Sequence, residues 1–280
     1  MAIPILHFWE KYYENPDEGL GSTYERFIIN RILFKTVKHF KIKSVLETPS
    51  FGFTGLSGIN SMYIAQKDCQ ITLMDHNQKR LDYIQRTWKD LELPFTGIYT
   101  EDYSSLPFEE KTFDMSWNFS ALWFVNDLSV FLKELDRVSK KVILLIVPNQ
   151  TGIGYLQQKY FGQDDLKKYL NEDYIKVHYI KSEMKKLKWK LLSHELLDCP
   201  LWPDIGMSKE DFLKKLKLSF LLPKKPSAHI KKEPVSILDY YSGKRPDMPK
   251  DFEKFEFFEK NAPHTFKKIW AHHQYLLFVR

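Results

Sequence analysis

The sequence has few cysteines, no long apolar run and no signal-peptide pattern. Cys69 and Cys199, the two cysteines among 280 residues, stand far apart. A disulfide framework is therefore not expected, and the reducing cytoplasm is the predicted location. No apolar run approaches the roughly 20 residues that cross a bilayer, so no transmembrane segment is expected. The first residues, MAIPILHFWEKYYE, also lack the pattern of a signal peptide.

The nine histidines do not predict a metal site. None of them forms a pair spaced for metal binding on one helix face. His272 and His273 are adjacent, and we interpret them as a surface pair that precedes a strand.

The net charge of +6 is unevenly distributed along the chain. Residues 1–150 hold 17 Lys and Arg against 19 Asp and Glu (−2), whereas residues 151–280 hold 25 against 17 (+8). A modestly basic C-terminal half could attract an anionic partner. Lysine-rich stretches such as KKLKWK are more simply interpreted as solvated helix faces.

Short apolar strands alternate with amphipathic helices over the first 150 residues. Strands are predicted at 44–47, 70–75, 96–102, 112–118 and 141–149. Helices are predicted at 24–40, capped by Ser22 or Thr23, and at 58–66, 77–91 and 127–140. This alternation indicates an α/β, doubly wound, mostly parallel sheet with helices on both faces.

The pattern changes after Asn149. A helical region at 163–187 precedes two further strands, 188–197 and 274–280. The segment between these strands holds eight prolines and many aromatic residues, so it is too long for a connector and too aromatic for a disordered chain. We interpret 198–272 as an insertion before the last strand that packs over the sheet edge on the substrate side.

Three acidic residues end the first three predicted strands. Glu47, Asp75 and Asp102 are separated by 28 and 27 residues, which is one βαβ unit each. Since the carboxyl ends of parallel strands share one edge, where doubly wound folds bind ligands, these carboxylates are expected to line that edge. Each acid alone could instead be a helix N-cap or a solvated strand end.

The turn after the first strand does not resemble a pyrophosphate site. A Rossmann-like turn with an acid further on suits both NAD and S-adenosylmethionine, because both offer a ribose diol to a carboxylate. A pyrophosphate needs glycines and backbone N–H groups pressed against it, but here the loop holds Pro49, Phe51 and Phe53. S-adenosylmethionine has no phosphate, and its sulfonium favours carboxylates and aromatic faces.

An ordered set of motifs then points to a family. VLE at 45–47, Asp75 in ITLMDHN, LPFEEKTFDMSWNFSALWFV (106–125) and ELDRVSKKVILLIVPN (134–149) together resemble a class I S-adenosylmethionine-dependent methyltransferase. The resemblance covers residues 24–149. It implies a seven-stranded sheet with an antiparallel last strand, and a Rossmann-like cofactor domain of 41–197 plus 273–280 preceded by an N-terminal helical cap, 1–40.

The resemblance also implies roles for the first loop. Glu47 would lie near the methionine ammonium, and the loop Ser50 to Gly55 would pass under the amino-acid portion. The family's motif has glycines where this sequence has Pro49 and Phe51. Gly52 and Gly55 would supply the permissive backbone of a slightly longer loop.

Further cofactor contacts are implied by the later motifs. Asp75 would accept hydrogen bonds from the ribose hydroxyls, with His76 beside the adenine. Asp102 would face the adenine amino group, next to Tyr103. Asn118, at the end of the fourth strand, would flank the cofactor and the reacting methyl group.

The expected activity is methyl transfer to a small molecule by in-line displacement, which needs alignment more than a fixed set of catalytic residues. No catalytic residue is therefore assigned. The substrate side is expected to be built from aromatic residues that could equally be core: Tyr12, Tyr13, Tyr24, Trp123 and Tyr155. The ring-rich stretch 7–26 could close over the cofactor as a lid.

Other functions remain open at this point. The lysine- and leucine-rich stretch 211–232 could form an amphipathic helix on a membrane or over a lipid, and its lysines could meet RNA, although no RNA-binding motif is present. The altered loop also suits a non-catalytic protein on the same fold. Tyr155 and Lys159 have the spacing of a short-chain dehydrogenase dyad, but the serine that such enzymes need is missing.

Overall fold

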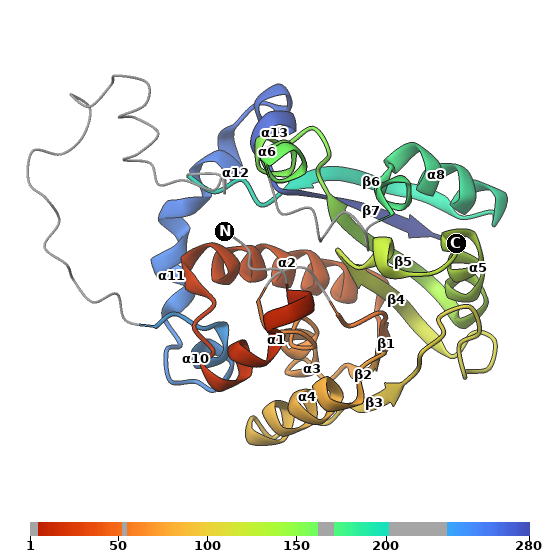
Figure 1. Cartoon of the computed structure of the whole chain (residues 1–280), viewed down its shortest axis with the longest axis horizontal. Coiled ribbons are helices and arrows are strands. Elements are labelled where there is room, and N and C mark those ends of the chain that lie inside the picture. Colours follow the sequence, from red (N-terminus) through yellow and green to blue (C-terminus); the bar gives the residue numbers. More distant parts are fainter. Residues whose placement is uncertain (1–4, 52–54, 162–170, 202–233) are drawn as a thin grey trace, which may run out of the picture.

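A computed structural model describes residues 5–51, 55–161, 171–201 and 234–280. Its centre is one seven-stranded sheet in the order β3-β2-β1-β4-β5-β7-β6 (Figure 1). β7 runs antiparallel to both of its neighbours, and the other pairs are parallel. The strands are β1 (Ser44–Glu47), β2 (Gln70–Asp75), β3 (Thr96–Tyr99), β4 (Phe113–Phe119), β5 (Ser139–Pro148), β6 (Lys190–Leu197) and β7 (His273–Val279). The predicted fold class is confirmed.

β5 contains a continuous apolar run, residues 142–147. Val142, Leu144 and Ile146 belong to the core on one face, and Ile143 and Leu145 belong to the core on the other. Since successive side chains point to opposite faces of a strand and both faces are covered here, both sets of side chains in this run are apolar.

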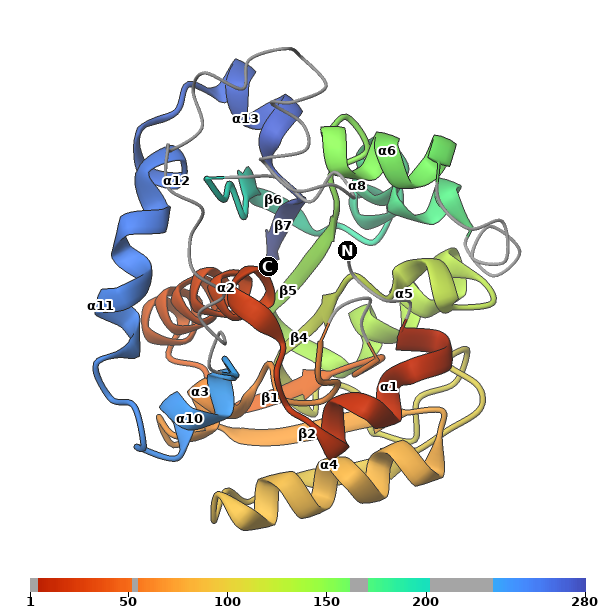
Figure 2. The ribbon, with the colours of Figure 1, turned by 60° about the vertical axis from the view of Figure 1, so that its left-hand side comes forward.

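The helices cover the sheet from both sides (Figures 1 and 2). One core contains residues of α2 (Gly19–Phe40), α3 (Met62–Ala65) and α4 (Gln78–Asp90). The opposite core contains residues of α5 (Leu128–Val138) and α8 (Val177–Lys186). Asn77 caps α4 by accepting from the Arg80 N–H at 2.9 Å, and Asp127 caps α5 in the same way.

Three predicted boundaries are wrong. The helix predicted at 58–66 is shorter, because α3 begins at Met62 after a series of turns. α2 begins at Gly19, so Ser22 and Thr23 lie inside the helix and do not cap it. Gly19 can open this helix because its φ of +71° suits glycine. β3 ends at Tyr99, where its pairing with β2 stops, so Asp102 lies in the following turn.

The remaining described elements lie around the two helical layers. They are α1 (Ile5–Glu14), η1 (Leu122–Phe124), α6 (Ile153–Phe161), η2 (Glu172–Ile175), α10 (Ile237–Tyr241), α11 (Met248–Glu253), η4 (Lys254–Glu256), α12 (Phe257–Asn261) and α13 (His264–Trp270). Part of the predicted insertion packs into the same core as α2 through Ile237, Tyr241, Met248 and Phe252. The expected amphipathic stretch 211–232 lies outside the described residues, as does part of the helical region expected at 163–187.

Among the described residues, no helix is both long and apolar enough to cross a membrane. Cys69 and Cys199 are both free thiols and both buried. The cytoplasmic location remains a prediction.

Candidate cofactor site

Glu47 ends β1 as a buried carboxylate at the carboxyl edge of the sheet. Its Oε2 accepts a hydrogen bond from Ser61 Oγ at 2.5 Å, and its Oε1 accepts one from Asn60 Nδ2 at 3.1 Å. Burial raises the pKa of Glu47 to about 7, against the opposing effect of these hydrogen bonds. A positive group in contact with this carboxylate would favour its ionised form.

Asp75 ends β2, the neighbouring strand, and is completely buried. Its Oδ1 accepts from the Asn77 N–H at 2.9 Å and from Arg80 Nη2 at 2.5 Å. Its Oδ2 accepts from Ser50 Oγ at 3.0 Å and from Arg80 Nε at 2.8 Å. These four hydrogen bonds use the acceptor capacity of the carboxylate.

Aromatic rings surround the Arg80 guanidinium and the end of β2. Phe51 is buried, lies 4.1 Å from the guanidinium, and packs edge-on against His76 at 5.4 Å between ring centres. His76 Nδ1 lies 3.3 Å from the hydroxyl of Tyr103, which is also buried. Burial lowers the pKa of His76, so its ring is neutral near pH 7. Phe51 also packs against Phe124, and the group offers flat apolar faces next to the Asp75–Arg80 pair.

Asn118 holds the loop after β1 in place. Its Nδ2 donates to the carbonyl oxygens of Thr48 at 2.9 Å and Pro49 at 3.3 Å. Its Oδ1 accepts from the Ala121 N–H at 3.1 Å, so the same side chain also fixes the turn after β4. The predicted residue therefore lies at the site, where it joins the two loops.

Gly55 is required where the loop meets the N-terminal helices. Its φ is +67°, and a Cβ at this position would lie 2.1 Å from Glu18 Oε1. Glu18 forms a buried ion pair with Arg26 of α2, at 2.6 Å from Nη2. Gly52 lies outside the described residues.

Arg26 connects this ion pair to Glu47. It donates to Asn60 Oδ1 and to the carbonyl oxygen of Leu56, and Asn60 in turn donates to Glu47. A buried arginine thus lies one side chain away from the buried carboxylate. Together they offer one charge of each sign, which suits the two charges of an amino-acid group.

Asp102 does not join the other two acids. It is exposed, and its carboxylate accepts hydrogen bonds from the N–H and Oγ of Ser104 at 2.8 and 2.6 Å. These hydrogen bonds lower the pKa of Asp102. Asp102 differs from the buried Glu47 and Asp75 because β3 is shorter than predicted, which leaves Asp102 in an exposed turn where Tyr103 is the buried residue. The role expected for Asp102 toward the adenine remains a prediction.

The expected substrate-side rings occupy different places. Tyr12 and Tyr13 of α1 are half-buried, and the Tyr13 hydroxyl donates to the Ser57 carbonyl at 2.8 Å. Trp123 is buried, and its Nε1 donates to the Ser120 carbonyl. Tyr155 is half-buried on α6, and Lys159 pairs with Glu172 at 2.5 Å. Their part in substrate binding remains a prediction.

Tyr24 lies in another region of the fold, near Asp198 and Glu259. It is buried on α2, and burial, together with the charges of Glu259 and Asp198, raises the pKa of its hydroxyl. His273, the first residue of β7, is buried in the same region. The interpretation of His272 and His273 as a surface pair is therefore wrong, because β7 starts at His273 and pairs there with both neighbours.

The internal partners of this site were not predicted from the sequence. Arg80 was detectable, because α4 starts just after β2 and its first turn returns to the end of that strand. Glu18 and Arg26 carried no signal, since their pairing depends on how α2 packs against the loop. Trp9 of α1 was also missed; it lies 5.5 Å from the Arg80 guanidinium.

Comparison with known proteins agrees with the architecture. The profile of a family described as methyltransferase domain matches residues 53–146. No curated protein matches the sequence significantly. Among solved structures, YcgJ from Bacillus subtilis is similar at 11% identity with a TM-score of 0.51, over 90% of this chain and 97% of that one.

Two further structures share the fold. A S-adenosylmethionine-dependent methyltransferase from Thermotoga maritima is 11% identical with a TM-score of 0.50, over 73% of this chain and 86% of that one. The cyclase SpnF is 14% identical with a TM-score of 0.50, over 90% of this chain and 80% of that one. At such identities these structures show the fold alone.

The strand order is that of a Rossmann-like methyltransferase fold. Residues 53–146 match the methyltransferase-domain profile, and this match implies S-adenosylmethionine as the cofactor. The residue types at the site fit this cofactor. Asp75, however, is already fully hydrogen-bonded by the protein itself.

Proposed function

We propose that this protein transfers the methyl group of S-adenosylmethionine to a small-molecule acceptor. The observation that carries the proposal is the placement of Glu47 and Asp75, two buried carboxylates at the carboxyl ends of adjacent strands. Three aromatic rings, from Phe51, His76 and Tyr103, lie on the Asp75 side of this pair. Carboxylates and flat rings are the groups that a ribose diol, an ammonium and an adenine require.

Each part of the cofactor then has a partner in this chain. Glu47 would hold the ammonium, and Arg26 would be available for the carboxylate after exchange with Glu18. Asp75 would hold the ribose hydroxyls, and His76 with Tyr103 would line the adenine. The cofactor supplies a methyl group on a sulfonium, and the protein's task is to hold it in line with the acceptor.

Cofactor entry requires Arg80 to release Asp75. The four acceptor positions of this carboxylate are filled, two of them by Arg80. The ribose hydroxyls would replace the guanidinium, which lies under Trp9 and Phe51. The first helix would therefore move with the arginine, as expected for a lid.

A small acceptor is favoured by the enclosure of the site. α1 covers the Asp75 side through Trp9, and Lys79 of α4 pairs with Glu10 of α1 at 2.8 Å. Rings of Tyr12 and Tyr13 lie at the same place. A covered, ring-lined site suits a small molecule better than a polymer. Methylation of a lipid or an RNA is the alternative that the basic C-terminal half supports.

A second candidate is a protein of this fold without methyl transfer. The filled hydrogen bonds of Asp75 favour it, and the cyclase SpnF shares the fold. In that case Arg80 would stay on Asp75 and the cofactor would not bind.

Titration calorimetry with S-adenosylmethionine and S-adenosylhomocysteine separates the two candidates. We expect both compounds to bind, and Asp75→Asn to bind them at least tenfold more weakly. Asp90→Asn is the matched control, because this exposed acid lies at the far end of α4 and should change affinity little. Absence of binding to the wild-type protein would remove the proposal. When the cofactor binds, methyl transfer to a panel of amines, phenols and thiols identifies the acceptor class.

A further inference from the structure

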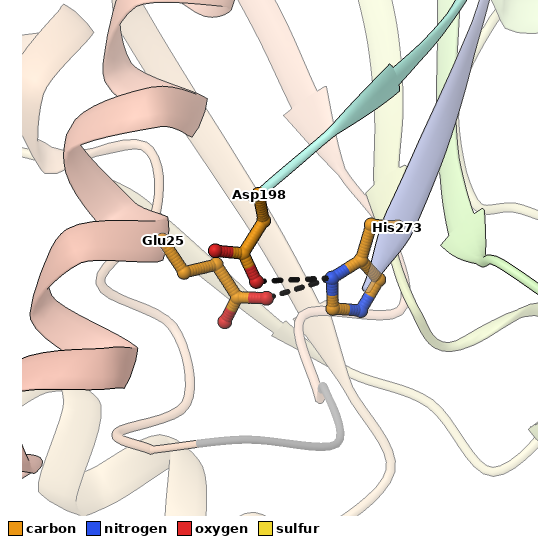
Figure 3. A group of neighbouring side chains, drawn as sticks. All are labelled: Glu25, Asp198 and His273. Carbon is orange, nitrogen blue, oxygen red and sulfur yellow. Dashed lines mark ion pairs between the residues drawn. The ribbon is translucent and has the colours of Figure 1, made fainter. Parts of the chain in front are cut away.

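A second group of buried polar residues lies away from Glu47 and Asp75. Glu25 of α2, Asp198 just after β6 and His273 at the start of β7 converge (Figure 3). One ligand atom of each lies within 4.8 Å of the other two, and all three residues are buried. They are far apart in the sequence and meet only in the fold.

The distances match those between the ligands of one metal ion. His273 Nδ1 lies 2.8 Å from Glu25 Oε1 and 3.9 Å from Asp198 Oδ2. Metal–ligand bonds of about 2.0–2.1 Å in a tetrahedral zinc site hold the ligand atoms about 3.3 Å apart. The two observed distances bracket this value, so small side-chain shifts would admit an ion between the three atoms.

The three side chains form a buried ion-pair group. His273 Nδ1 pairs with Glu25 Oε1 at 2.8 Å and also lies within ion-pair distance of Asp198 Oδ2. A divalent cation between these atoms would take the place of the imidazole proton, because a histidine must be neutral at the nitrogen that binds a metal. Two buried carboxylates would then neutralise the charge of the ion.

The surroundings would support a bound ion. His272 Nδ1 lies 2.7 Å from Asp198 Oδ2 and orients that carboxylate from outside the group. A donor set of two carboxylates and one imidazole suits divalent transition metals, and Zn²⁺ in particular. Mg²⁺ prefers six oxygen ligands and keeps several waters, so a buried nitrogen ligand disfavours it.

We infer that Glu25, Asp198 and His273 bind one divalent transition-metal ion, with Zn²⁺ as the preferred ion. The ion joins α2 to the β6–β7 pair. It also lies close to the end of β4, because the His273 ring packs against Phe119 at 5.1 Å. This site is independent of methyl transfer and of cofactor binding.

The test starts with the full-length protein freed of metal by chelator and dialysis. Calorimetry with ZnCl₂ is expected to show one site, and MgCl₂ is expected to give none. Glu25→Gln and Asp198→Asn, which preserve side-chain shape, should each weaken Zn²⁺ binding at least tenfold. Glu253→Gln and His39→Gln, at exposed positions, are the matched controls and should bind as the wild type does.

Two outcomes would overturn the inference. One is a wild-type protein that binds no Zn²⁺, and the other is undiminished binding by both acid variants. Should the variants fail to fold, the absorption spectrum of wild-type protein loaded with Co²⁺ decides. The inference requires nitrogen and oxygen ligands, so a thiolate charge-transfer band, which would implicate nearby Cys199, contradicts it.

Discussion

Arg80 donates two hydrogen bonds to Asp75, at 2.8 and 2.5 Å, and both side chains are almost completely buried. The arginine therefore occupies the carboxylate that the ribose hydroxyls of the cofactor would need. A buried ion pair of this kind adds little net stability, but the loss of one partner is costly. Arg80 thus stabilises the cofactor-free protein and at the same time competes with the cofactor for Asp75.

Replacing Arg80 should separate these two effects. In Arg80→Leu the carboxylate of Asp75 loses its ionic partner, so the free energy of unfolding should fall by about 3–5 kcal/mol. The cofactor no longer has to displace a guanidinium, so its affinity should rise about tenfold or more. Chemical denaturation and calorimetry measure the two quantities.

Arg86→Leu is the control, because Arg86 is exposed on the same helix. It should leave both stability and affinity nearly unchanged. Weaker cofactor binding by a folded Arg80→Leu protein would show that the arginine belongs to the binding site and does not block it.

Gly55 should be intolerant of a side chain. Gly55→Ala places a Cβ 2.1 Å from Glu18 Oε1 at a backbone φ of +67°, so the Glu18–Arg26 pair must shift. We expect a loss of about 2–4 kcal/mol in the free energy of unfolding, from backbone strain and the disturbed buried pair. Thermal and urea denaturation measure it.

Gly21→Ala provides the comparison. Gly21 lies within α2, has no atom within 4 Å of a Cβ built at this position, and needs no positive φ. Alanine should therefore be neutral or stabilise the helix by up to about 1 kcal/mol. Equal destabilisation by both substitutions would refute the role assigned to Gly55.

Because of Glu47, the free energy of unfolding should fall with rising pH while the affinity for the cofactor should rise. Its pKa in the folded protein is about 7, above the ordinary carboxyl value of 4.5. The folded state therefore holds a proton that the unfolded state has lost, and the contribution of Glu47 to stability declines as pH rises from 4.5 to 7. The decline amounts to about 3 kcal/mol at most. Urea denaturation at a series of pH values should show this fall in the free energy of unfolding for the wild type and not for Glu47→Gln.

Cofactor affinity should rise over the upper part of the same range. The cofactor's ammonium favours the ionised carboxylate, so between pH 5.5 and 7 the affinity should increase by up to about tenfold per pH unit. Calorimetry with S-adenosylhomocysteine measures the slope. An identical slope for wild type and Glu47→Gln would show that Glu47 does not contact the ammonium.

The sheet was predictable because its signals are local. β5 is a long apolar run, and α4 and α5 have an apolar stripe with a capping residue in front. Strand ends were harder, since pairing and not composition ends β3 at Tyr99 and leaves Asp102 in a turn. The positions of Glu47 and Asp75 followed from the βαβ spacing alone.

The contacts that these residues make in the fold were harder to predict from the sequence. Glu25 meets His273, and Arg26 meets Asn60, only because of where α2 packs in the fold. Such long-range contacts depend on packing that no short motif records. The roles expected for Asn118 and Tyr103 toward the cofactor remain predictions, although both residues lie at the site.

A crystal structure of the protein with S-adenosylhomocysteine tests the central claim most directly. We predict the ribose hydroxyls on Asp75, the ammonium on Glu47, and the Arg80 guanidinium moved away from Asp75. A ligand bound elsewhere, or bound while both Arg80–Asp75 hydrogen bonds persist, would contradict the proposed site.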